Sequence, residues 1–481
     1  MKKTITFASI AIVAIALFFA CKKAGENSSF NSPNSKSSGI KALVACNFVT
    51  LSGTLTTQTL SAANVYKISG IVRIPSGVTL TIPAGTVLQG IKSATTAWLV
   101  IEKGGKLIAT GTSSNPIVFT SDQNAGARAA GDWGGIAFAG NAPTNVSTGL
   151  DIPLSGSYTL SGGSSISADN SGNLQYVQIH FAGKGYTNDA SKSALLLNAV
   201  GTGTAIDHVQ ISNAQYDGIG SYGGTVKQTY MISLNAGRTD FPISYGYTGK
   251  IQFIAAMRMI NGVTPTGPAY GLDISNDPTG TNNTPLTQPV ISNATVLGPN
   301  YCNSTAVNSN FQYAVRFNNN GAGKIYNSVF SSWNATSTSR GLLINGNSTI
   351  SQTASNNLEF SYNSFHNSGV TPYTSSLWTG GCESTMARWI EGTGVASCKE
   401  SGYQVVGVSD LDYNSSFCSA FCDNGFISNF TLGTNTDLDT PNFSWDTGNS
   451  FNHPVYRGAF GGTDFTQSWS NWCPLNTVYC S

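Results

Sequence analysis

Short runs of alternating apolar and polar residues recur along this chain, and their spacing is the feature that most constrains its fold. The stretch "NVYKISGIVRIPSGVTLTIPAGTVLQG" places Val78, Leu80 and Ile82 in strict period two, which is typical of a half-buried β-strand. A drifting period indicates a solenoid whose rungs carry loops of variable length. Here the period is roughly 20–39 residues, measured between Leu174, Ile206, Val226, Ile251, Val290, Ile325 and Leu358. We therefore predict an all-β fold built as a parallel β-helix.

Asparagines follow several of these runs, in "ISNA", "LNA", "ISNA" and "YNS". An asparagine at a turn can hydrogen-bond the backbone of a neighbouring rung, so we expect these residues to be structural. The glycine-rich stretch "GDWGGIAFAG" contains Trp133 and precedes no helix start, which disfavours a phosphate-binding loop. We expect Trp133 to cover the edge of a rung. The alternative is a tryptophan that stacks on a ligand.

The N-terminus, "MKKTITFASIAIVAIALFFACKK", begins with two lysines after Met1, followed by a short apolar run and a small residue before Cys21. This pattern predicts a secretory signal peptide over residues 1–20. The residues "FFAC" resemble a bacterial lipobox, with Phe18 where leucine is usual, so Cys21 is the predicted lipidation site. The alternative is simple cleavage. Residues 21–45, rich in Ser and Asn, are expected to be a polar tether.

Composition narrows the classes of partner. Charged residues make up 10% of the chain and the net charge is +1, so no basic stripe is available for nucleic acid. Without Cys21 the exported chain has eight cysteines, an even number that suits four disulfides. We predict the local pairs Cys382–Cys398, Cys418–Cys422 and Cys473–Cys480, with Cys46 left for Cys302. A metal site at the CxxxC of Cys418 and Cys422 is the alternative.

Several motifs also carry a family resemblance, among them "LIATGTSSNPIVFTS", "GDWGGIAFAGNAP", "YGYTGKIQF", "PVISNATVLGP" and "YRGAFGGTDFTQSWSNW". In this order they resemble the exported β-helix lipoproteins of Bacteroidota, most of which have no assigned activity. The resemblance implies a right-handed parallel β-helix and an outer-membrane lipoprotein, facing either the cell surface or the periplasm. This chain departs from the family where acidic runs are expected, because only Asp217 and Asp240 remain of them.

Candidate chemistry rests on a few acids. Asp217 and Asp240 lie about one rung apart, and neighbouring rungs are where a glycoside hydrolase would present its two carboxyl groups. We favour a structural role, with Arg238 as an ion-pair partner. The loop "GLDISNDPTGTNN" offers Asp273, Asn276 and Asp277 as oxygen ligands for calcium, which a lyase would need; an Asx-rich turn is the alternative.

The C-terminal region is rich in aromatic residues, and Trp445, Trp469 and Trp472 suit stacking on sugars. They equally suit a disulfide-rich cap over the last rung, which we favour. We therefore expect a β-helix over residues 46–370 and C-terminal rungs with a cap over 371–481. For function we favour an envelope lipoprotein that binds a polysaccharide or an envelope protein without catalysis. A polysaccharide lyase or glycoside hydrolase on the same scaffold is the alternative.

Overall fold

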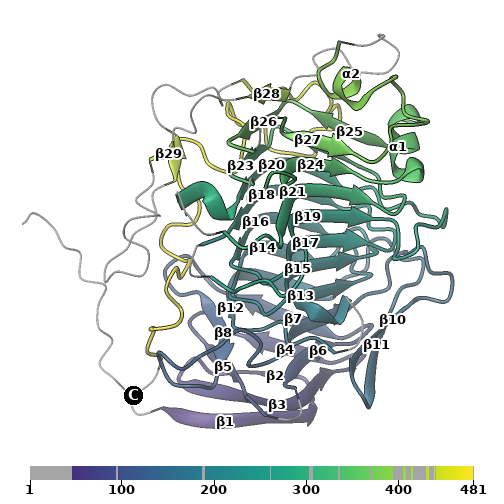
Figure 1. Cartoon of the computed structure of the whole chain (residues 1–481). Helices are drawn as coiled ribbons and strands as arrows, with labels where there is room; N and C mark the ends of the chain where they lie inside the picture. The colour runs from purple at the N-terminus through teal and green to yellow at the C-terminus, as the bar shows by residue number, and fades with distance from the viewer. Residues whose placement is uncertain are drawn as a thin grey trace, which may run out of the picture. The chain divides into compact units, whose positions relative to one another are not determined.

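The computed structural model describes residues 46–93, 96–186, 190–259, 262–302, 307–333, 336–368, 371–393, 405–407, 413–414, 430–432, 438 and 440–479. Their strands form one 26-stranded sheet in which successive rungs pair in parallel. The sheet winds into a stacked column (Figure 1). The predicted all-β parallel β-helix is confirmed.

The column has three faces, which the chain visits in turn. The first face contains β2 (Gln58–Thr59), β4 (Thr79–Ile82), β7 (Lys106–Thr110), β22 (Gly323–Tyr326) and β25 (Leu358–Ser361). The second contains β5 (Val87–Gly90), β8 (Ile117–Ser121), β23 (Val329–Ser331), β26 (Asn363–His366) and β28 (Val405–Gly407). Five long strands span both faces: β12 (Gly172–His180), β14 (Ala205–Ser212), β16 (Lys227–Leu234), β18 (Lys250–Met257) and β20 (Val290–Leu297).

The third face carries the candidate site described below. Its strands are β6 (Trp98–Ile101), β9 (Gly135–Ala139), β13 (Ser193–Asn198), β15 (Asp217–Tyr222), β17 (Thr239–Ser244), β19 (Ala269–Ser275), β21 (Phe311–Asn318), β24 (Arg340–Ile344) and β27 (Tyr373–Ser375). The first rung is made by β1 (Asn47–Thr54) on β3 (Asn64–Ile74), which reaches both the second and the third face.

Few elements lie outside this sheet. Two antiparallel pairs are present, β10 (Leu150–Ser155) with β11 (Tyr158–Gly162), and β29 (Tyr413–Asn414) with β30 (Thr431–Leu432). The helical segments are η1 (Ala190–Lys192), η2 (Pro299–Cys302), α1 (Asn347–Ala354) and α2 (Met386–Ile390). Within the described residues, no helix combines the length and hydropathy that crossing a membrane would require.

The register corrects part of the predicted repeat. Leu174 pairs with Ile206, as expected. Ile206 pairs in turn with Gln228, and Gln228 pairs with Ile251. The residue at this point of the repeat is therefore Gln228, two residues after the predicted Val226. The next rungs align Ile291, Ile325 and Phe360, so Val290 and Leu358 are also shifted. Side chains two residues apart on a strand point to the same face, so a pattern of period two does not distinguish Val226 from Gln228.

Each long strand turns a corner at a residue with left-handed backbone conformation. Four of these residues, Tyr176, His208, Tyr230 and Phe253, have φ between 50° and 55°. Such a conformation costs about 1–2 kcal/mol for a residue with a side chain. Here the four rings stack on one another, with centroids 4.4, 4.5 and 4.9 Å apart. Stacking worth about 0.5–1.5 kcal/mol a pair offsets much of that cost.

The asparagines after the strands have the predicted structural role. Asn213 and Asn235 both have positive φ, and the Asn235 side chain accepts a hydrogen bond from the backbone N–H of Met259 at 2.7 Å. Asn363 accepts from the N–H of Ser328 and donates to the carbonyl of Ile325. These bonds join neighbouring rungs at corners, where the sheet hydrogen bonds are interrupted.

Residues 440–479 form a C-terminal strap that runs along the second face, back toward the early rungs (Figure 1). Three side-chain amides of the solenoid each exchange two hydrogen bonds, 2.7–2.9 Å long, with the backbone of one strap residue. The pairs are Asn327 with Asn442, Gln252 with Asn452 and Gln210 with Asn471. Arg128, in an early rung, donates to the carbonyls of Pro474 and Thr477.

This placement differs from the predicted cap over the last rung. The outward side chains of the second face include Ile232, Leu234, Ala255, Met257 and Leu297, which would otherwise be exposed. The strap covers them with a group of apolar side chains that includes Ala459, Phe460, Trp469 and Trp472. Burial of this apolar surface therefore stabilises the strap in its position along the second face.

Candidate functional site

A cleft of about 680 Å³ opens on the third face, over β15, β17, β19 and β21. Below it, the outward side chains are apolar and are covered by the β10–β11 hairpin, which packs on Trp98, Ala137, Leu196 and Tyr222. Above the hairpin the outward side chains are no longer all apolar. Pro242, Asp273 and Arg316 occupy matching positions there on three successive strands. The cleft therefore begins where the apolar cover ends.

The ion pair of Asp273 and Arg316 lines the cleft. Arg316 donates from Nε and Nη2 to the two carboxylate oxygens of Asp273, at 2.8 and 2.6 Å. Its Nη1 donates to the hydroxyl of Tyr270 at 2.9 Å, and the guanidinium lies 3.9 Å from the centroid of that ring. Burial alone would lower the pKa of Arg316, but the charge of Asp273 raises it above its ordinary value. Arg316 is therefore a permanent cation and cannot act as a base.

A second ion pair lies at the edge of the cleft. Arg238, a lining residue, donates through Nε to Asp217 at 2.7 Å and through Nη2 to the other carboxylate oxygen. Asp217 is fully buried and also accepts from the backbone N–H of Thr239. The predicted partnership of Asp217 with Arg238 is present, and it is buried instead of solvated.

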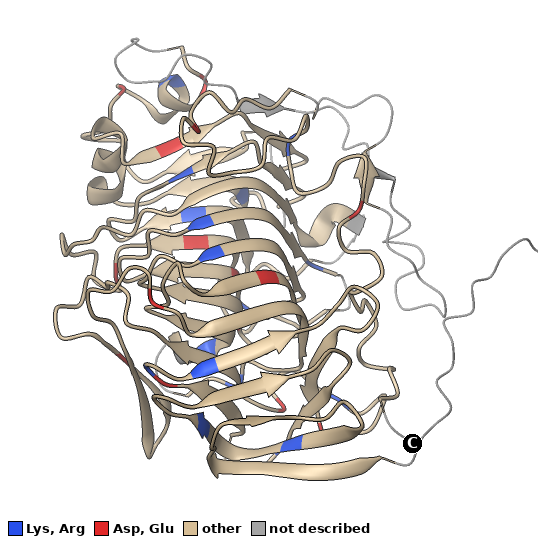
Figure 2. Cartoon of the chain, turned by 180° about the vertical axis from the view of Figure 1, so that it is seen from behind, with Lys and Arg blue, Asp and Glu red and all other residues tan. Residues whose placement is uncertain are grey.

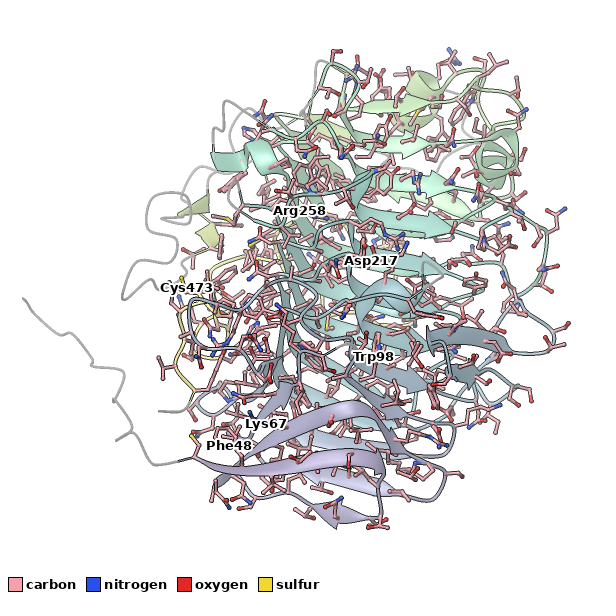
Figure 3. All side chains as sticks on the ribbon, turned by 60° about the horizontal axis from the view of Figure 1, so that its bottom comes forward. Phe48, Lys67, Trp98, Asp217, Arg258 and Cys473 are labelled. Atoms are coloured by element: carbon pink, nitrogen blue, oxygen red, sulfur yellow. The ribbon has the colours of Figure 1, made fainter. Side chains whose placement is uncertain are left out.

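A third ion pair lies below the floor. The side chains of Asp240 and Arg258 are both almost fully buried and contact each other at 2.8 Å (Figure 3 marks Arg258 and Asp217). Arg258 also donates to the carbonyls of Arg238 and Tyr270, at 2.8 and 3.0 Å, and so holds the backbone of two lining residues. Burial raises the pKa of Asp240 to about 6, against the opposing effect of Arg258. The pair positions the cleft without entering it.

The predicted acid pair is not arranged for hydrolysis. Both Asp217 and Asp240 are buried and each is bound to its own arginine, so neither faces the cleft as a free carboxyl group. Among the described lining residues, Asp273 is the only acid. Hydrolysis of a glycosidic bond generally requires two carboxyl groups about 5–9.5 Å apart on either side of that bond.

The predicted calcium ligands point to separate partners. Asp273 binds Arg316, whereas the side chain of Asn276 accepts from Asn145 and from the N–H of Thr287. Asp277 accepts from Thr279 and Thr281 within its own turn, and these bonds outweigh burial and lower its pKa. In the part of the chain that the structure describes, no three acidic, histidine or cysteine side chains gather as a metal site would require.

Most of the predicted sugar-stacking tryptophans are unavailable to a ligand. Trp133 is 0% exposed, and its indole N–H donates to the carbonyl of His180 at 2.8 Å. Trp469 and Trp472 are buried in the strap. Trp445 is half-buried and stacks on Tyr326, with ring centroids 4.1 Å apart. The aromatic residues that line the cleft are different ones, Tyr222, Tyr245 and Tyr270, and sequence analysis did not select them.

The cysteines lie partly beyond the described residues. Cys46, Cys382 and Cys473 are disulfide-bonded. Figure 3 shows Cys473 on the strap. The lipidation candidate Cys21, the side chain of Cys302, and Cys398, Cys418, Cys422 and Cys480 fall outside the described residues, so lipidation and all four pairings stay predictions.

Comparison with known proteins agrees with this architecture. A family model described as a pectate-lyase-like β-helix domain matches residues 53–400. The chain belongs to this family. Membership supports a carbohydrate-related β-helix protein, and the residues that line the cleft, from Ala190 to Asn319, all lie within the matched region. No curated protein and no solved structure matches the chain significantly.

Proposed function

We propose that this pectate-lyase-like β-helix binds a glycan in the cleft of the third face without cleaving it. The observation that carries the proposal is the lining of the cleft, in which a half-buried Tyr245 and three prolines accompany Arg316, Asn318 and Asn319. Rings and prolines suit the C–H faces of sugars, and fixed donors suit their hydroxyl groups. A volume near 680 Å³ falls in the range of ligand pockets.

Binding without turnover is favoured because the charged side chains of the cleft already form ion pairs. Asp273 receives two hydrogen bonds from Arg316, and the pKa of Arg316 is raised. A general base must be free to take a proton and needs a pKa near the working pH. The cleft therefore offers recognition groups, and its described residues supply neither a base nor an acid pair.

Incubation of the protein with a panel of neutral and uronate-containing polysaccharides tests this proposal. We expect retardation of the protein in affinity gels by at least one polysaccharide, with no new reducing ends and no unsaturated products absorbing near 235 nm. Turnover that is lost in Asp273→Asn would contradict the proposal and support the alternative, a polysaccharide lyase or glycoside hydrolase. Absence of both binding and turnover would point to a protein partner.

We also propose that the protein is an outer-membrane lipoprotein of the envelope, anchored through a lipidated Cys21 and facing the cell surface or the periplasm. The support is the sequence "FFAC" and the polar residues 22–40 that follow it. Two or more acyl chains give stable anchoring, whereas one is marginal.

We expect wild-type protein to enter the detergent phase on phase partitioning, and Cys21→Ser to stay in the aqueous phase. Cys46→Ser is the control, because it removes a cysteine that lies beyond the signal and is expected to partition like wild type. Cys21→Ser in the detergent phase would exclude the anchor.

A further inference from the structure

The charges around the cleft are balanced pair by pair, and this bears on which glycans it accepts. Three arginines lie in or under the cleft, and three aspartates bind them, as Arg238 with Asp217, Arg258 with Asp240 and Arg316 with Asp273. The described lining residues include no further charged side chain. Resting on the proposed function, we infer that the cleft selects neutral glycan segments and disfavours uronates.

The geometry of Arg316 carries this inference. An arginine recognises a carboxylate best through two parallel N–H donors, and in Arg316 the Nε and Nη2 side of the guanidinium is occupied by Asp273. The remaining nitrogen, Nη1, donates to Tyr270. To bind Arg316 in this way, the carboxylate of a uronate would have to replace Asp273, and the negative charge of Asp273 repels it.

The same occupation suits a neutral sugar. Asp273 and Arg316 are partly exposed, at 19% and 23% of their side-chain surface, so their outer edges can accept from and donate to hydroxyl groups. Ser275 and Asn318 lie beside them at matching positions on β19 and β21. On the side of the ribbon that Figure 2 shows, lysine and arginine positions are interspersed with aspartate and glutamate positions.

Matched pairs of soluble polysaccharides test the inference, because each pair shares a backbone and differs in charge. The pairs are methyl-esterified and free polygalacturonate, hydroxyethyl- and carboxymethyl-cellulose, and dextran and dextran sulfate. For wild type we expect the neutral member of any bound pair to bind about tenfold or more tighter. This binding should be unchanged between about 0.05 and 0.5 M NaCl, because screening acts on charge interactions.

The Asp273→Asn variant gives a more specific test than the wild-type comparison. It keeps the side-chain shape and frees the cationic fork of Arg316, so the preference should move toward the anionic member by about tenfold or more. Asp151→Asn is the matched control, since Asp151 is exposed on the β10–β11 hairpin and does not line the cleft. Should Asp273→Asn fail to fold, Ser275→Lys adds an unpaired cation in the same place, with Ser157→Lys on the hairpin as its control.

Each outcome is decisive. Tighter binding of the anionic members by wild type, or an unchanged preference in folded Asp273→Asn or in Ser275→Lys, overturns the inference and leaves glycan binding itself intact. Failure to bind any of the polysaccharides overturns both the inference and the proposed function. A neutral preference that moves toward anions in either variant, and in neither control, establishes the inference.

Discussion

Replacing Arg258 by methionine is expected to lower the free energy of unfolding by about 3–5 kcal/mol at pH 8, because it leaves a buried carboxylate without its cation. Both side chains of the Asp240–Arg258 pair are almost completely buried, and Ser233 is the side chain that still donates to Asp240 once Arg258 is gone. The substitution also removes the two hydrogen bonds that Arg258 donates to the backbone carbonyls of Arg238 and Tyr270. Chemical denaturation at pH 8 measures this loss.

The effect should depend on pH in a defined direction. Burial already raises the pKa of folded Asp240 from 3.8 to about 6, so this group favours the folded state below its unfolded pKa and loses that contribution as the pH rises through about 6. Without Arg258 the folded pKa rises further. The variant should therefore be destabilised less at pH 5 than at pH 8.

The double variant Arg258→Met/Asp240→Asn removes the uncompensated charge and serves as the control. It should recover part of the lost stability at pH 8 and show a smaller difference between the two pH values. Equal destabilisation of Arg258→Met at pH 5 and pH 8 would contradict the assignment of this loss to the Asp240 carboxylate.

Replacing Trp133 by alanine is expected to cost about 3–5 kcal/mol, the usual range for a large aromatic side chain removed from a core. The ring is 0% exposed and lies directly against Gly90 of β5, where an added Cβ would be only 2.5 Å from the ring. The indole N–H also donates to the carbonyl of His180. Thermal or chemical unfolding measures the loss.

Trp133→Phe separates the hydrogen bond from the packing. It keeps most of the apolar volume and leaves the carbonyl of His180 without the indole donor, so we expect a loss of about 1–3 kcal/mol. If Trp133→Ala were as stable as wild type and instead lost glycan binding, the tryptophan would be a ligand-stacking residue after all.

The fold could be predicted from the sequence because its signals are local. Period-two runs such as Val78, Leu80 and Ile82 indicate strands wherever they occur, and their recurrence indicates a solenoid. Asparagine corners were also predictable, since the side chain of Asn235 bonds the backbone of the next rung along the chain. These inferences need no knowledge of which residues meet at long range.

The cleft could not be predicted, because it depends on register across rungs of unequal length. Asp273 and Arg316 are 43 residues apart, farther than any interval measured between the predicted strands, and their pairing follows only from the register of β19 on β21. The strap was missed for the same reason, since Gln210 and Asn471 are 261 residues apart. Aromatic composition alone does not distinguish a buried Trp469 from an exposed sugar-binding ring.

Binding to a cleft-blocked variant tests the central claim most directly. Ser275 is half-exposed on the floor of the cleft, and Ser275→Leu should fill the space beside Asp273 and Arg316 while leaving the solenoid folded. Ser157→Leu places the same side chain on the exposed hairpin, outside the cleft. By calorimetric titration with the best-bound polysaccharide of the panel, we predict binding about tenfold or more weaker for Ser275→Leu and unchanged for Ser157→Leu. Equal affinity of wild type and Ser275→Leu would show that the glycan binds elsewhere and would contradict this account.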